Sequence, residues 1–249
     1  MALNDEFVPT GGDDEPEKSN DLVARTAGGL GGAALGLLGA MLFGPPGALI
    51  GSAASPLLTD GAKGLGRVLR RRLERTQQAI DAATEFSGRN FDDLVEVASD
   101  DDRRLEIIGQ ALQGAALSKD GATIRALGRA LAQGVLADDD ARVDESLRIV
   151  STLAALDPID VKVLDRMCEP GSSWFIRGTS NNLNRRSVTG EIPEAEPVVD
   201  HVIARLSQLG LVTRPDSGGL AWDGVPWIAT DFGHLCVDTL HAAGAVEDV

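Results

Sequence analysis

The densest group of side chains that could contact a ligand is a run of arginines shortly after residue 59. Lys and Arg gather at the cytoplasmic flank of membrane-inserted segments and attract anionic lipid. A solvated helix surface is the alternative interpretation of such a run. We predict lipid or anion contact for its members, which are Arg67, Arg70, Arg71, Arg72 and Arg75.

Metal and thiol chemistry have weaker support. His234, Cys236 and His241 form a loose set of metal-ligand types, but His234 and Cys236 would point to different sides of a helix, which disfavours a metal site. Cys168 and Cys236 are the two cysteines of the chain, too few for a disulfide scaffold. Each stands beside an apolar residue, so we predict reduced thiols in the core.

Two short motifs match enzyme signatures by letters alone. Gly29-x-Gly31-x-x-Ala34 fits a dinucleotide fingerprint, but no strand pattern precedes it, and position 54 is Ala where an acidic residue is needed. Asp231-Phe232-Gly233 fits the kinase magnesium triplet without the catalytic-loop signature that should precede it. The sequence also lacks a nucleophile elbow and a phosphate loop. We predict a protein that is not an enzyme and needs no cofactor.

The charge balance disfavours nucleic acid as a partner. Asp and Glu number 38 against 23 Lys and Arg, and the net charge of −15 repels a phosphate backbone. Aromatic residues make up 4% of the chain, with no tyrosine, so Leu, Ile, Val and Ala must fill the core. That mixture suits helices better than sheets, and we predict a mainly α fold.

Composition divides the chain into four parts. Residues 1–22 are acidic and poor in apolar side chains, which predicts a disordered tail and is unlike a secretory signal. Residues 23–60 are predicted to form an apolar Gly-zipper helical hairpin, and residues 61–156 a helical body. Residues 157–249 are predicted to form a winged-helix-like domain with a small β-wing.

The hairpin prediction comes from an uncharged run from Thr26 to Thr59, divided by two prolines. Its arms, Ala27–Phe43 and Gly47–Leu58, are each shorter than the roughly 20 apolar residues of an ordinary membrane span. Small residues recur every four positions, which lets another backbone approach closely. We predict association with the membrane or with other copies of the chain through these packing residues: Gly28, Gly32, Gly36, Ala40, Gly44, Gly47 and Gly51.

Apolar residues at helical spacing predict a bundle after the hairpin. The first helix is amphipathic with a basic start, and Asn90 is expected to cap the second. The later predicted helices have acidic residues in their first turns, where the helix dipole favours negative charge. The predicted helical ranges are 61–86, 91–98, 102–117, 121–136 and 140–156.

The C-terminal region has the element order of a winged helix. A helix from Pro158 to about Met167 and a polar stretch at 177–197 precede a helix at 198–209. Strands at 211–213, 220–222 and 227–230 and a last helix to about Ala242 follow. Acidic residues outnumber basic ones here, so we predict protein contacts in place of DNA contacts. The candidate contact residues of the second helix are Asp200, His201, Arg205 and Gln208.

Two segments together resemble the Abi-alpha family of bacterial abortive-infection proteins. The first is LGRALAQGVLADDDARVDESLRIVSTLAALDPIDVKVLDRM, and the second is VIARLSQLGLV followed by WIATDFGHLCVDTL. The resemblance includes the helix-initiating phrase Leu156-Asp157-Pro158 and the turn Thr230-Asp231-Phe232-Gly233. It implies a role in phage defence or prophage-mediated exclusion. The expected location is the bacterial cytoplasm, peripheral to or inserted in the inner membrane.

Three classes of function remain open on the sequence. The first is a membrane-associating defence effector that self-associates and contacts a protein through its winged helix. The second is a cytoplasmic regulator that binds DNA through the winged helix, which the acidity argues against. The third is a phage or prophage structural or assembly component, with the hairpin buried between identical subunits.

Overall fold

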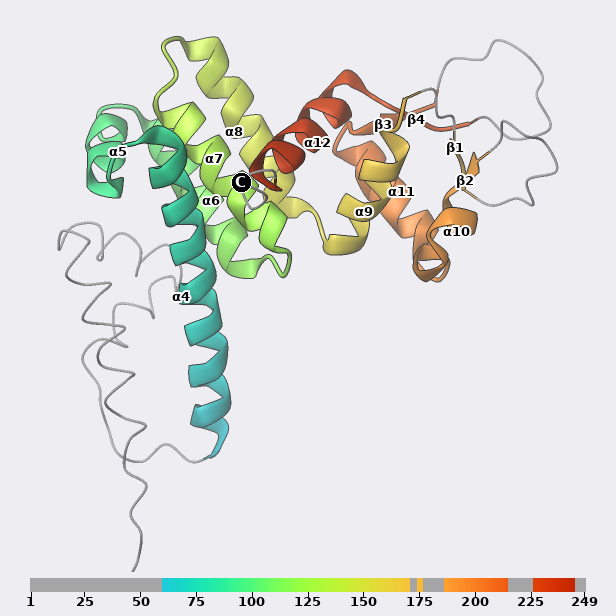
Figure 1. Cartoon of the computed structure of the whole chain (residues 1–249), viewed down its shortest axis with the longest axis horizontal. Helices are drawn as coiled ribbons and strands as arrows, with labels where there is room; N and C mark the ends of the chain where they lie inside the picture. The colour runs from blue at the N-terminus through green and yellow to red at the C-terminus, as the bar shows by residue number, and fades with distance from the viewer. Residues whose placement is uncertain (1–59, 171–173, 177–185, 215–225, 245–249) are drawn as a thin grey trace, which may run out of the picture. The chain divides into compact units, whose positions relative to one another are not determined.

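The computed structural model describes residues 60–170, 174–176, 186–214 and 226–244, with side chains from Gly66 onward. Within these ranges the protein is mainly helical, with two small two-stranded sheets, as Figure 1 shows. The mainly α prediction is therefore confirmed. The predicted tail and Gly-zipper hairpin lie outside the described residues, as does the strand expected at 220–222.

The helices of the first part begin and end within two residues of the predicted positions. Each of the four helices after the first starts with a side-chain cap. In each, a side-chain oxygen accepts a hydrogen bond from a backbone N–H two or three residues later. The capping residues are Asn90, Asp101, Asp120 and Asp139. The helices are α4 (Asp60–Ser87), α5 (Phe91–Ala98), α6 (Asp102–Leu117), α7 (Gly121–Val135) and α8 (Asp140–Ala155).

Small residues let these helices pack at short distances. A Cβ placed on Gly128 of α7 would lie 2.2 Å from the Ala79 carbonyl oxygen of α4. A Cβ on Gly114 of α6 would lie 2.5 Å from the Cβ of Ala154 in α8. Leucine and isoleucine side chains fill the remaining space of the core, among them Leu94, Ile107, Ile108, Leu112, Leu127, Leu131 and Leu153.

Helix α4 has two halves with different surroundings. The second half packs on α6 and α7 through buried residues, namely Thr76, Ala79, Ile80 and Ala83. The first half has no buried residue from Gly66 to Arg75, and Val68 and Leu73 are 49% and 39% exposed. Figure 1 shows these first turns extending beyond the helices that cover the second half. Other helices therefore cover the apolar side of α4 along only part of its length.

The C-terminal region consists of short helices and paired strands. The strand pair β1–β2 is parallel and β3–β4 is antiparallel, with Val212 opposite Ala229. The polar stretch expected at 177–197 contains a strand and two short helices that its composition did not predict. The elements are α9 (Pro158–Met167), β1 (Trp174–Phe175), β2 (Arg186–Ser187), α10 (Val188–Glu191), η1 (Pro193–Ala195), α11 (Val199–Gln208), β3 (Val212–Thr213), β4 (Ile228–Ala229) and α12 (Asp231–Gly244).

The turn from β4 into α12 has the predicted Thr-x-x-Gly form. The Thr230 hydroxyl oxygen accepts a hydrogen bond from the Gly233 N–H at 3.0 Å, which caps the helix. A Cβ on Gly233 would lie 2.3 Å from the Leu211 carbonyl oxygen. Glycine is therefore needed here because another backbone segment lies against it.

The glycine contact between α4 and α7 gives a test of the packing. We expect Gly128→Ala to lower the free energy of unfolding by about 1–3 kcal/mol, because the added methyl group overlaps a backbone oxygen that cannot rotate away. Gly66→Ala is the matched control, since nothing lies within 4 Å of its Cβ position. The control should gain up to about 1 kcal/mol from helix propensity. Urea denaturation followed by circular dichroism measures both; equal changes would contradict this account.

Candidate functional site

The predicted arginines lie together on the exposed half of α4. Arg67, Arg71 and Arg75 recur every four residues and share one side of the helix, with Arg70 and Arg72 flanking that row. No side chain of these five forms an ion pair or hydrogen bond with another residue of the described part. One carboxylate, Glu74, lies among these five arginines, so the segment is strongly basic on a protein whose net charge is −15.

The four candidate residues of α11 do not form one contact surface. Asp200, His201 and Gln208 are exposed, whereas Arg205 reaches the start of α9. Its Nη1 lies 2.6 Å from Asp157 Oδ2 and 2.9 Å from Asp160 Oδ2. Arg205 thus fixes α11 against α9, a role that the helical spacing did not reveal.

Asp160 is the buried member of this ion-pair group. Its side chain is 1% exposed, and its Oδ2 also accepts a hydrogen bond from the Asp157 N–H at 2.8 Å. Its Oδ1 has no hydrogen-bond partner. Burial raises the pKa of Asp160 above the ordinary value, although the Asp157 N–H and Arg205 oppose this rise. Arg205 is the guanidinium that pairs with this buried carboxylate, beside the hydrogen bond from the Asp157 N–H.

Arg186 is also bound within the protein. It forms ion pairs with Glu169 and Glu191, and its guanidinium carbon lies 4.8 Å from the centroid of the buried Trp174 ring. These contacts connect the end of α9 with β1, β2 and α10. Like Arg205, Arg186 is engaged in holding the C-terminal elements together.

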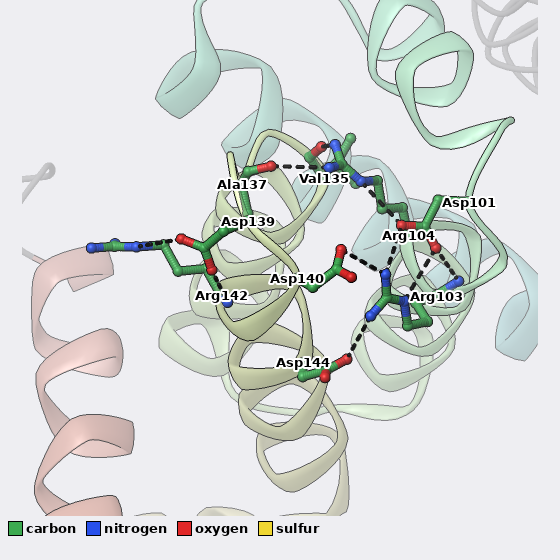
Figure 2. A network of polar contacts seen from close by, with 9 residues as sticks. All are labelled: Asp101, Arg103, Arg104, Val135, Ala137, Asp139, Asp140, Arg142 and Asp144. Carbon is green, nitrogen blue, oxygen red and sulfur yellow. Dashed lines mark hydrogen bonds and ion pairs between the residues drawn. The ribbon is translucent and has the colours of Figure 1, made fainter.

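A network of polar contacts joins the adjoining ends of α6, α7 and α8, as Figure 2 shows. Arg103 pairs with Asp101, Asp140 and Asp144 across these helices. Arg104 donates hydrogen bonds to the Val135 carbonyl at 2.6 Å and the Ala137 carbonyl at 3.0 Å. The network satisfies backbone acceptors at the end of α7 and has a structural role.

A second arginine pair holds the last helix on the bundle. Arg125 and Arg129 of α7 donate hydrogen bonds to the carbonyls of Ala243 and Ala242, at 3.2 and 3.0 Å. The Arg129 guanidinium carbon also lies 4.5 Å from the centroid of the Phe86 ring. Cationic side chains are favourable at these carbonyls because the C-terminus of a helix carries partial negative charge.

The cysteines and histidines do not assemble a metal site among the residues that the structure describes. Cys236 is buried and Cys168 is half-buried, and burial raises the pKa of both thiols to about 12. The prediction of core cysteines is confirmed for Cys236 and holds in part for Cys168. The exposed His241 lies 2.6 Å from Asp165.

No helix of the described part is both long and apolar enough to cross a membrane. The glycine rows from Gly28 to Gly51 lie outside that part. No family model, curated protein or solved structure compared with the chain matches it.

The ion pair between α9 and α11 gives a second test. We expect Arg205→Met to lower the free energy of unfolding by about 3 kcal/mol, because Asp160 is left buried without a counter-charge. This loss of stability should become smaller as the pH falls. Burial raises the pKa of Asp160 in the folded protein, so protonation of this carboxyl favours folding.

The control for this test uses the Asp160→Asn background. In that background Arg205→Met should lower the free energy of unfolding by only about 1 kcal/mol, as for the loss of one ordinary hydrogen bond, because no buried charge remains. Urea denaturation of all four proteins gives the coupling energy. The assignment is wrong if Arg205→Met costs the same in both backgrounds.

Proposed function

We propose that the protein is a non-enzymatic phage-defence protein of the abortive-infection or exclusion type, acting at the inner membrane. Its Gly-rich segment at 23–60 associates with the membrane or with other copies of the chain. The basic half of α4 contacts anionic lipid headgroups. The C-terminal region contacts a protein partner. The resemblance of its sequence to the Abi-alpha family supports the defence role.

The proposed membrane contact rests on the surroundings of the α4 arginines. They are free of ion pairs with other described residues, and the first of them, Arg67, comes eight residues after an uncharged run rich in glycine. Arginines near a bilayer surface gain about 1 kcal/mol each from anionic lipid. A basic helix that follows an apolar segment is therefore well suited to the cytoplasmic face of a membrane.

We propose a winged-helix fold for the C-terminal region. The order α9, α11, β3, β4, α12 and the Thr230 cap support it. Protein contact is favoured over DNA contact because Arg186 and Arg205 are held in ion pairs with carboxylates of their own region. A DNA reader needs its cations free for phosphate.

Flotation of the full-length protein with lipid vesicles tests the membrane contact. Vesicles rich in phosphatidylglycerol should carry more protein than pure phosphatidylcholine vesicles. Arg70→Gln with Arg71→Gln should weaken partitioning about thirtyfold, which corresponds to about 2 kcal/mol for two arginines. Arg89→Gln with Arg148→Gln is the matched control, since both are exposed. Binding that is indifferent to lipid charge contradicts the proposed α4 contact.

Infection of bacteria that express the protein tests the defence role. We expect lower plating efficiency for at least one phage of a panel, and loss of this protection when residues 27–58 are deleted. Circular dichroism of the deleted protein should retain the helical signal of the described bundle. Equal plating of every phage with and without the protein contradicts the proposal.

A further inference from the structure

An open cleft of about 740 Å³ lies between α7, α8 and α12. Its apolar surface includes Phe86, Leu136, Ile149 and Leu235, and Phe86 is 43% exposed. Exposed aromatic area beside a hollow of this size is typical of a contact surface. The membrane contact proposed above does not use it.

Three exposed carboxylates border the cleft, from three different segments. They are Asp138 in the connection before α8, Glu145 on α8 and Asp238 on α12. None of the three forms an ion pair within the described ranges of the chain. The two arginines of the cleft are engaged, Arg129 by the Ala242 carbonyl and Arg142 by Asp139 at 3.7 Å. A carbonyl is neutral, so Arg129 keeps its positive charge. Three carboxylates against two arginines give the lining a formal net charge of −1.

The exposed half of α4 has the complementary properties. It carries five arginines against one carboxylate, Glu74, and Val68 and Leu73 are exposed apolar residues on it. Within the described part, this amphipathic face has no buried residue from Gly66 to Arg75, and acidic and apolar neighbours would complement it. The cleft offers both on one surface.

This helix cannot reach the cleft of its own chain. Phe86, at the end of α4, already lines the cleft. Arg71 precedes Phe86 by 15 residues of continuous helix, which is about 22 Å at 1.5 Å per residue. A contact between the two surfaces must therefore join two molecules.

We propose that the exposed half of α4 of one copy docks in the acidic cleft of a second copy. The arginines pair with Glu145, Asp238 and Asp138, and Leu73 and Val68 pack near Phe86 and Leu235. The two surfaces are different, so the contact is head-to-tail and leaves one free surface of each kind at the ends. The inference rests on charge and apolar complementarity and does not depend on the proposed membrane function.

Sedimentation velocity of the full-length chain without lipid tests the proposal. We expect reversible self-association that weakens as the salt concentration rises. Arg70→Glu with Arg71→Glu should raise the dissociation constant at least tenfold, and Glu145→Arg with Asp238→Arg should do the same. The matched control is Asp93→Arg with Glu96→Arg, which changes exposed carboxylates of α5 that lie away from the cleft and should leave association unchanged.

Mixing the α4 variant with the cleft variant provides the decisive measurement. Each retains one unaltered surface, so the mixture should associate although neither variant does so alone. Misfolding cannot produce this recovery. The cleft variant should still bind phosphatidylglycerol vesicles like the unaltered protein, which separates this contact from the proposed membrane contact. Association that survives both variants, or a mixture that stays monomeric, overturns the proposal.

Discussion

The close approach of α4 and α7 at Gly128 is the constraint on which the rest of the described structure depends. The Ala79 carbonyl occupies the place where a side chain would stand, so the two backbones meet without intervening atoms. This contact anchors only the second half of α4. The first half is left to project, with its arginines in solvent. Small residues thus determine both where the bundle is tight and where its candidate contact surface begins.

Several arginines of the described part fall into three groups with different surroundings. Arg104, Arg125 and Arg129 donate to carbonyls near helix ends, where free acceptors would otherwise remain. Arg103, Arg186 and Arg205 compensate carboxylates between elements. The arginines of the first half of α4 do neither. On this strongly acidic chain, five arginines beside the single carboxylate of Glu74 form a surface suited to an anionic partner.

Two partners compete for that surface in our proposals. Anionic lipid offers a continuous negative plane, and the cleft of a second copy offers a few carboxylates around an apolar floor. Both use the same arginines, so a copy bound to lipid through α4 cannot dock that helix in a neighbour. Self-association in the absence of lipid and attachment in its presence would then be exclusive states.

The sequence by itself determined the helices, since their signals are local. The caps at Asn90, Asp101, Asp120 and Asp139, the start at Pro158 and the Thr230 turn act within a few residues of chain. Only the tertiary structure decided which charges are free. Arg205 and Arg71 are both polar positions of amphipathic helices. Arg205 forms an ion pair with the buried Asp160, 45 residues earlier in the chain, whereas Arg71 forms no ion pair with a described residue. Such pairing depends on how helices cross, which periodicity does not encode.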